Sequence, residues 1–187
     1  MRVFVVTPPA PVITWANLNG HLRLEGDETE RTYIEGLAEA ATGHIDGPTG
    51  WLGRSLGAQT LEARMDNFGC GRINLPCPEI LSIVSVKYID ADGVEQTVPS
   101  DQYDLIGNSI EPAYGKSWPR PRMQREAVRI RYTAGYSILP GPIRSAILLM
   151  VGDLFANRET VVTGTISSQI SMSTTVENLL TPYRQWC

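Results

Sequence analysis

The chain has 187 residues, of which 42% are hydrophobic and 19% are charged, and its formal net charge is −4. This length predicts one domain with a sizeable core and argues against two full domains. The negative net charge excludes a protein that binds nucleic acid or acidic membranes over its whole surface. Cys70, Cys77 and Cys187 leave one cysteine unpaired in any intramolecular scheme, which argues against a secreted disulfide framework and favours free thiols.

The N-terminal part of the chain predicts two helices. A short helix is expected at 15–22. Asp27 is a candidate N-cap for the second helix, with Glu30 three residues later as in a capping box. The second helix carries apolar residues at helical spacing, namely Ile34, Leu37, Ala38, Ala41 and Ile45. The acidic residues expected on its solvent-facing side are Glu28, Glu35 and Glu39. The glycine-containing stretch 43–57 is expected to be an irregular loop or a frayed helix end.

The middle of the chain, 59–133, predicts β-structure. Its last strand is the clearest, because residues 128–133 alternate apolar with basic or polar side chains at a period of two. Earlier strands are expected at 61–68, 80–89, 96–98 and 103–106. The turn between the second and third of these falls at 90–93.

An apolar helix is predicted at 142–157, with Pro142 at a favoured first helical position. The residues that form its core face are Ile143, Ile147, Met150, Val151, Leu154 and Phe155. Leu148 and Leu149 widen the apolar arc, which fits burial on two sides, with a neighbouring subunit as one candidate cover. The helix would be about 24 Å long, short of the roughly 30 Å that a membrane span needs, so we expect a packed helix.

The C-terminal part of the chain predicts an arm and a short helix. Residues 160–175 are polar with interspersed glycine and serine, and we expect a flexible loop or arm there. A short helix is expected at 176–180. The terminal segment joins apolar anchors to an arginine through Leu179, Leu180, Pro182, Tyr183, Arg184 and Trp186. Such a segment can dock in a partner's groove, or it can pack as a plain C-terminal helix on its own subunit.

Catalytic and metal sites find no support in the sequence. His21 and His44 lie in different elements without partners at ligand spacing. Residues 90–93 look like the start of a calcium loop, but Glu95 and Asp101 stand where that loop needs glycine and glutamate, so a hairpin turn is expected. No phosphate-binding glycine loop or nucleophile elbow is present. We therefore expect no enzyme, no cofactor and no metal site.

Charge is unevenly placed along the chain. Residues 25–39 hold six acids against one base, and residues 116–131 hold six bases against one acid. The bases of interest are Arg120, Arg122, Arg125, Arg129 and Arg131. Two solvated faces explain this as well as a head-to-tail subunit interface does, in which the acidic face with Glu28, Glu35 and Glu39 meets the basic face of the next copy. A third interpretation places the basic stretch on a DNA channel, which the net charge weakens.

Several segments, in this order and spacing, carry a resemblance to a known family. Thr133-Ala134-Gly135-Tyr136 precedes Pro142-Ile143-Arg144-Ser145-Ala146-Ile147-Leu148-Leu149, and Asn157-Arg158-Glu159 follows. Trp118-Pro119 stands upstream, and the chain ends through Leu179-Leu180-Thr181-Pro182-Tyr183-Arg184. Together these segments resemble the head-tail connector (adaptor) proteins of tailed bacteriophages, in the gp6-like or gp8-like group. The likeness covers almost the whole chain.

The resemblance implies an α+β connector domain over 1–187 that is mainly helical, with N-terminal helices, a long apolar C-terminal helix and a central β-strand insertion. Its helical core would comprise about 12–58 and 140–187, and its insertion about 59–133. It also implies a virion neck protein, assembled in the bacterial host cytoplasm, that forms a ring under the portal, twelve-fold in the particle. The ring would bind the portal through the C-terminal segment, join a stopper or tail-completion protein, and leave a channel through which DNA passes.

Two alternatives remain open from the sequence. One is another neck ring protein, a stopper or tail terminator, which is usually richer in β-structure. The other is a small prophage-encoded enzyme or ligand-binding protein, which would need a pocket with convergent polar groups.

Overall fold

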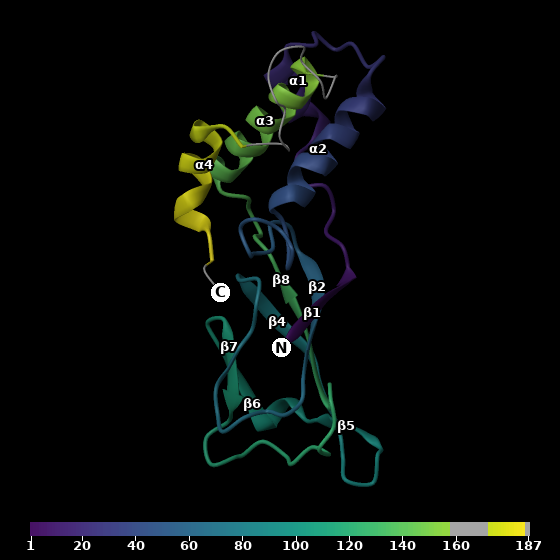
Figure 1. The fold of residues 1–187 in the computed structure, drawn as a ribbon, viewed down its shortest axis with the longest axis vertical. Helices are drawn as coiled ribbons and strands as arrows, with labels where there is room; N and C mark the ends of the chain where they lie inside the picture. Colours follow the sequence, from purple (N-terminus) through teal and green to yellow (C-terminus); the bar gives the residue numbers. More distant parts are fainter. Residues whose placement is uncertain (158–171, 186–187) are drawn as a thin grey trace, which may run out of the picture.

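The computed structural model describes residues 1–157 and 172–185, and in this part of the chain four α-helices gather at one end of an elongated molecule and eight strands at the other (Figure 1). The helices are α1 (Trp15–Leu22), α2 (Arg31–Ile45), α3 (Gly141–Ala156) and α4 (Thr174–Leu180). The strands are β1 (Arg2–Thr7), β2 (Gln59–Met65), β3 (Ile73–Asn74), β4 (Ile80–Ile89), β5 (Glu95–Val98), β6 (Tyr103–Ile106), β7 (Ser109–Pro112) and β8 (Val128–Ala134). Two 3₁₀ turns, Ser100–Gln102 and Thr181–Tyr183, complete the regular elements.

The described strands form two antiparallel sheets. The larger sheet has the order β1-β2-β8-β4-β5, and the smaller one has the order β3-β7-β6. β8 lies at the centre of the larger sheet, where its alternating sequence gives the burial that a half-buried strand requires: Val128, Ile130 and Tyr132 are buried and the residues between them are not. The smaller sheet packs on this inner face, so that both sheets share one hydrophobic cluster.

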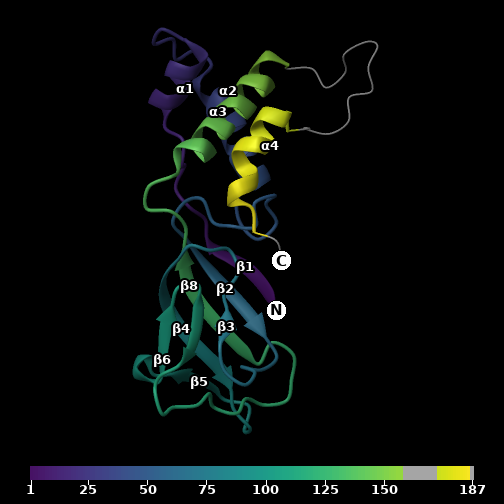
Figure 2. The same ribbon diagram turned by 90° about the vertical axis from the view of Figure 1, so that its left-hand side faces the viewer.

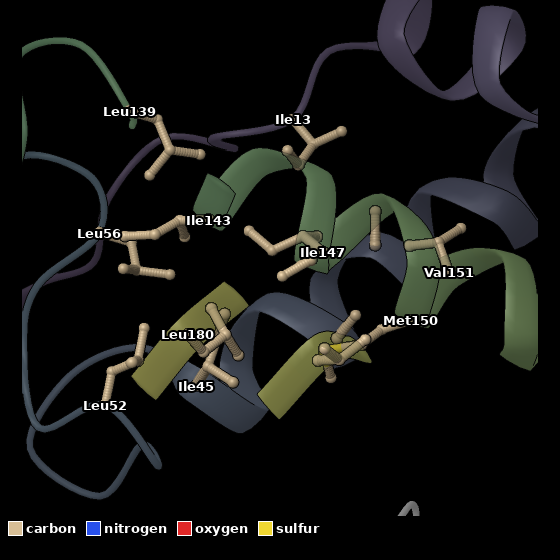
Figure 3. Packing of buried hydrophobic residues seen from close by; sticks show 14 of the residues in the cluster. Ile13, Ile45, Leu52, Leu56, Leu139, Ile143, Ile147, Met150, Val151 and Leu180 are labelled. Atoms are coloured by element: carbon tan, nitrogen blue, oxygen red, sulfur yellow. The ribbon is translucent and has the colours of Figure 1, made fainter. Parts of the chain in front are cut away.

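The helical end has a separate hydrophobic core built around α3. Ile143, Ile147 and Val151 of α3 are fully buried, and in Figure 3 they lie among side chains of α2, α4 and the loop between α2 and β2. α3 contacts α1, α2 and α4 of its own chain. Leu148, Leu149, Leu154 and Phe155 are half-buried and pack against the same cluster. The wide apolar arc of α3 is therefore covered largely by helices of the same subunit.

A narrow waist joins the two ends (Figure 2). At Gly135 the backbone passes so close to Gly57 that an added Cβ would lie 2.1 Å from the Gly57 carbonyl oxygen, and its φ of +129° also favours glycine. Asp46 ties the loop after α2 to the sheet, because its Oδ1 accepts hydrogen bonds from the Leu56 amide at 2.6 Å and from Gln59 Nε2 at 3.2 Å. These contacts fix how the helical end sits on the strands.

The expectation of a mainly helical connector core with a long apolar C-terminal helix is wrong. Of the residues that the structure describes, 30% are helical and 27% lie in strands, so helix and strand contribute almost equally. The apolar helix α3 is internal, because α4 follows it and is itself part of the core. The error has a physical cause: short strands such as β3 and β7 carry too few residues to show a period, whereas the long apolar pattern of α3 stands out.

Local differences from the sequence-based expectations concern caps and the N-terminus. α2 starts at Arg31 and has no side-chain cap; Asp27 instead accepts hydrogen bonds from the amide and hydroxyl of Thr29, at 2.8 and 2.5 Å. Residues 2–7 form the edge strand β1, for which no strand was expected. The predicted arm at 160–175 lies for the most part outside the described residues, and its last residues belong to α4.

Candidate interaction surfaces

Of the three acidic residues predicted for the solvent side of the second helix, Glu35 and Glu39 lie on the exposed face of α2, and Glu28 lies in the exposed segment just before it. Arg31 sits between two of them, with Nε 2.9 Å from Glu35 and a terminal nitrogen 3.4 Å from Glu28. Glu39 is also exposed, one turn further along the helix. Because all these groups face solvent, the two ion pairs of Arg31 contribute little to stability. The face remains net negative and accessible to a partner.

Two of the predicted bases, Arg129 and Arg131, project from β8 onto the outer face of the larger sheet. Arg131 binds Glu62 at 2.7 Å, and Arg64 binds the same carboxylate at 2.8 Å. Burial alone would raise the pKa of Glu62, but the hydrogen bonds and charges of Arg131 and Arg64 outweigh it and lower that pKa below its usual value. Glu62 is almost fully buried beneath them.

A second carboxylate that binds two basic side chains lies on the same sheet. Glu95 of β5 accepts from Lys87 at 2.8 Å and from Arg129 at 3.2 Å. The hydrogen bond and charge of Lys87 lower the pKa of Glu95. Arg129 and Arg131 are therefore largely neutralised inside their own subunit.

The other predicted bases, Arg120, Arg122 and Arg125, lie in the loop 113–127 between β7 and β8, which we call the basic loop. All three are exposed. The basic loop runs across the end of the molecule farthest from the helices, whereas the acidic residues lie at the helical end (Figures 1 and 2). The structure therefore keeps these two charged groups apart within one subunit.

The C-terminal segment belongs to the helical core of its own subunit. Val176 and Leu180 are fully buried, and Leu179 and Tyr183 are half-buried against the same cluster. Arg184 lies over the Trp51 ring, with its guanidinium carbon 4.2 Å from the ring centroid. The Gln185 amide donates to the Leu52 carbonyl at 2.9 Å, which holds the chain end against the loop after α2.

Within this segment, Pro182 is exposed and is therefore free to touch a partner. Trp186, which the sequence also nominated for docking, lies outside the described residues, as does Cys187.

Trp118 covers a local core. Its ring stacks on Phe68 with centroids 4.8 Å apart, and its Nε1 donates to the Gly71 carbonyl at 2.7 Å. Trp51 and Trp118 therefore both have partners within their own subunit. Among the described residues, the most exposed large apolar side chains, which the sequence did not reveal, are those of Tyr114 and Met123, with relative exposures of 103% and 94%. They stand singly in a loop without periodicity, so no pattern could reveal their exposure.

The described residues hold no group of three or more His, Cys, Asp or Glu side chains arranged to bind a metal ion. No helix in that part of the chain has the length and apolarity required to span a membrane. At the hairpin 90–93, the Asp90 carboxylate accepts hydrogen bonds from the amides of Asp92 and Val94, at 3.0 and 2.9 Å, so its oxygens shape the turn.

Comparison with known proteins rests on structure, since no protein-family model and no curated protein sequence matches the chain. A chain from the neck of an empty gene transfer agent (GTA) particle, computed with C6 symmetry, is similar with a TM-score of 0.79 and 21% identity, and 100% of this chain and 97% of that chain are covered. A chain from the virion of a native GTA particle gives 0.76 and 20% with the same coverage, 100% and 97%.

A third similar chain comes from the neck of a native GTA particle, computed with C12 symmetry. It gives a TM-score of 0.67 and 19% identity over 100% of this chain and 97% of that chain. At these identities the likeness establishes the fold, and it extends over all of this chain and 97% of each of the other three.

Proposed function

We propose that this chain is a structural protein of the neck of a tailed-phage-like particle, where copies form a ring that joins the head to the tail. The observation that carries the proposal is the full-length likeness to chains from GTA necks, at a TM-score of 0.79 with 97% of that chain covered. The resemblance of the sequence to head-tail connectors supports it independently. The protein would act by contact and would need no catalytic residue, cofactor or membrane.

The ring is the second element of the proposal. GTA neck structures were computed with C6 and C12 symmetry, and a twelve-fold ring of this chain is compatible with both. Heterologous contacts close into such rings when the rotation between subunits is constant. We place Glu28, just before α2, and Glu35 and Glu39 on the exposed face of α2 in contacts with neighbouring subunits. Arg129 and Arg131 would contribute less, because Glu95 and Glu62 already neutralise them.

Docking to the portal is assigned to the C-terminal segment. Leu179 and Leu180 would hold the segment in its own subunit, while Pro182, Tyr183, Arg184 and Trp186 would meet the portal. The Arg184–Trp51 stack supports this assignment, since a cation over an aromatic ring near the chain end gives a prearranged contact surface. The ring would sit in the virion neck, assemble in the host cytoplasm, and leave a channel through which DNA passes transiently.

The test is complex formation between the purified chain and its cognate portal ring, followed by size-exclusion chromatography with light scattering and by negative-stain microscopy. Removing residues 176–187 would be uninformative, because it strips Val176 and Leu180 from the core. The suitable variants are Arg184→Ala and deletion of 186–187, with the distant Arg72→Ala as control. We expect a symmetric complex that both C-terminal variants weaken. A wild-type chain that forms no ring and binds no portal would overturn the proposal.

A further inference from the structure

The basic loop presents two large apolar side chains to solvent. Tyr114 and Met123 are 103% and 94% exposed, more than the other large apolar residues that the structure describes. Tyrosine, methionine and arginine are the residue types enriched where proteins bind one another. The loop therefore has the composition of a contact surface, and the side chains of Tyr114 and Met123 are left almost wholly exposed by the subunit.

The backbone of the basic loop is held in place at several points. Trp118 anchors its middle through the stack on Phe68 and the 2.7 Å hydrogen bond to Gly71. Further along, the Arg122 amide donates to the Ile89 carbonyl at 2.8 Å. Near the loop's end, the Glu126 amide donates to Asp66 Oδ1 at 2.9 Å. Such anchoring lowers the entropic cost of binding, because the exposed side chains start from a fixed backbone.

The charge of the basic loop is uncompensated. Its four bases, Lys116, Arg120, Arg122 and Arg125, form no ion pair with any residue in 1–157 or 172–185. Its single acid, Glu126, is already bound to Arg2 at 2.9 Å and to Arg64 at 3.3 Å. A chain with a net charge of −4 thus concentrates free positive charge at one tip. The complementary partner surface is acidic.

We infer that the basic loop docks onto a second neck protein whose surface is acidic and has apolar pockets for Tyr114 and Met123. This inference rests on the proposed function, in which the C-terminal segment faces the portal, so the second protein is the stopper or tail-completion protein. Duplex DNA fits less well, because its phosphate backbone offers no apolar pocket to the Met123 side chain. Another copy in the same ring fits less well too, since the acidic α2 face lies at the opposite end of the molecule.

The experiment measures binding of the purified chain to three probes separately: the cognate portal ring, the cognate stopper or tail-completion protein, and a 30-base-pair DNA duplex. Two variants alter the loop independently, Arg125→Glu in charge and Met123→Ser in apolar surface. Matched controls are Arg23→Glu at the helical end and Ile138→Ser, whose side chain is 79% exposed near the waist. Both loop positions are exposed, and circular dichroism would verify that the variants fold.

We expect each loop variant to weaken binding of the stopper or tail-completion protein by about tenfold or more, with portal binding and the controls unchanged. Binding of the wild-type chain should also weaken as salt rises. Unchanged binding of that protein by both loop variants overturns the inference while leaving the ring and portal proposal intact. Loss of portal binding, or loss of DNA binding alone, overturns it by assigning the loop to a different partner. Failure of the wild-type chain to bind any probe overturns the proposed function itself.

Discussion

At the scale of single residues, the outer face of the larger sheet depends on buried Glu62. Its side chain is 8% exposed, and its carboxylate binds Arg131 at 2.7 Å and Arg64 at 2.8 Å. Replacing it by glutamine leaves Arg131 without a counter-charge and leaves Arg64 with only Glu126, at 3.3 Å. We expect Glu62→Gln to lower the free energy of unfolding by about 1–2 kcal/mol at pH 7, less than for a fully buried pair, because both arginines are partly exposed.

The pH dependence of this effect has a definite sign. The pKa of Glu62 is lowered in the folded protein, so its contribution is present above the usual glutamate pKa and is lost as the pH falls through the folded value. The deficit of Glu62→Gln, measured by urea unfolding, should therefore shrink between pH 7 and pH 3. The control is Glu111→Gln, whose exposed pair with Arg72 should matter little. An equal deficit at both pH values would contradict this account.

Asp46 is expected to behave in the opposite way. Burial raises its pKa, and the hydrogen bonds from Leu56, Gln59 and Gly47 offset this only in part. The folded state therefore binds the proton more readily than the unfolded state, and stability falls as the pH rises between the two pKa values. Asp46→Asn keeps an acceptor for the Leu56 amide without the buried charge. We expect it to match or exceed the wild type at pH 7, by up to about 1 kcal/mol.

The comparison that tests this is Asp46→Ala, which removes the acceptor as well. It should lower the free energy of unfolding by about 1–3 kcal/mol. Urea unfolding at pH 4 and pH 7 would measure both variants. A large loss for Asp46→Asn at pH 7 would show that the negative charge itself holds the loop, contrary to the direction of its pKa.

At the scale of elements, the crossing of two backbones at the waist depends on Gly135. An alanine there would bring Cβ within 2.1 Å of the Gly57 carbonyl oxygen at a φ of +129°. We expect Gly135→Ala to cost at least about 3 kcal/mol, since backbone on both sides must move. Thermal unfolding would measure it, with Gly141→Ala at the start of α3 as control, where an added Cβ meets nothing within 4 Å. Equal melting temperatures for the two variants would refute a tight crossing.

The sequence predicted best those elements whose hydrophobic residues repeat with a clear helical or strand period. The strand at 80–89 and the helix at 15–22 coincide with β4 and α1, because each carries enough residues between clear breakers. β3 has two residues and β7 four, too few for a pattern. β1 was missed because its strand conformation is stabilised by pairing with β2, residues 59–65, which lies far along the chain.

For the candidate surfaces, the sequence predicted which segments are rich in charged residues but not which of those residues form ion pairs. The sequence placed six bases within 116–131 but could not separate them. Arg129 and Arg131 find Glu95 and Glu62 through strand pairing, whereas Arg120 and Arg125 stay free in the loop. That division follows from the register of β8 with its neighbours, which is a tertiary property. For the same reason the sequence could not tell that Leu180 is a core residue of its own subunit.

At the scale of the whole molecule, the two ends have separate cores. One cluster contains α3 and its helical neighbours, and the other fills the space between the sheets. They are joined by the waist around Gly57 and Gly135, where backbone contacts replace a continuous layer of apolar side chains. Such a construction lets each end keep its own partner surface rigid. The helical end carries the acidic face and the C-terminal segment, and the strand end carries the basic loop.

Because the two cores are separate, we expect a destabilising core substitution at one end to loosen mainly the structure of that end. Ile147→Ala leaves a cavity beside α3 and should cost about 2–5 kcal/mol. Hydrogen exchange followed by mass spectrometry should then show faster exchange in α2 and α3, with β2 and β8 much less affected. The reciprocal variant, Ile130→Ala, should accelerate exchange in the sheet and spare the helices. Uniform acceleration in both variants would mean that the waist couples the cores into one cooperative unit, and that force or binding at one end is transmitted as unfolding to the other.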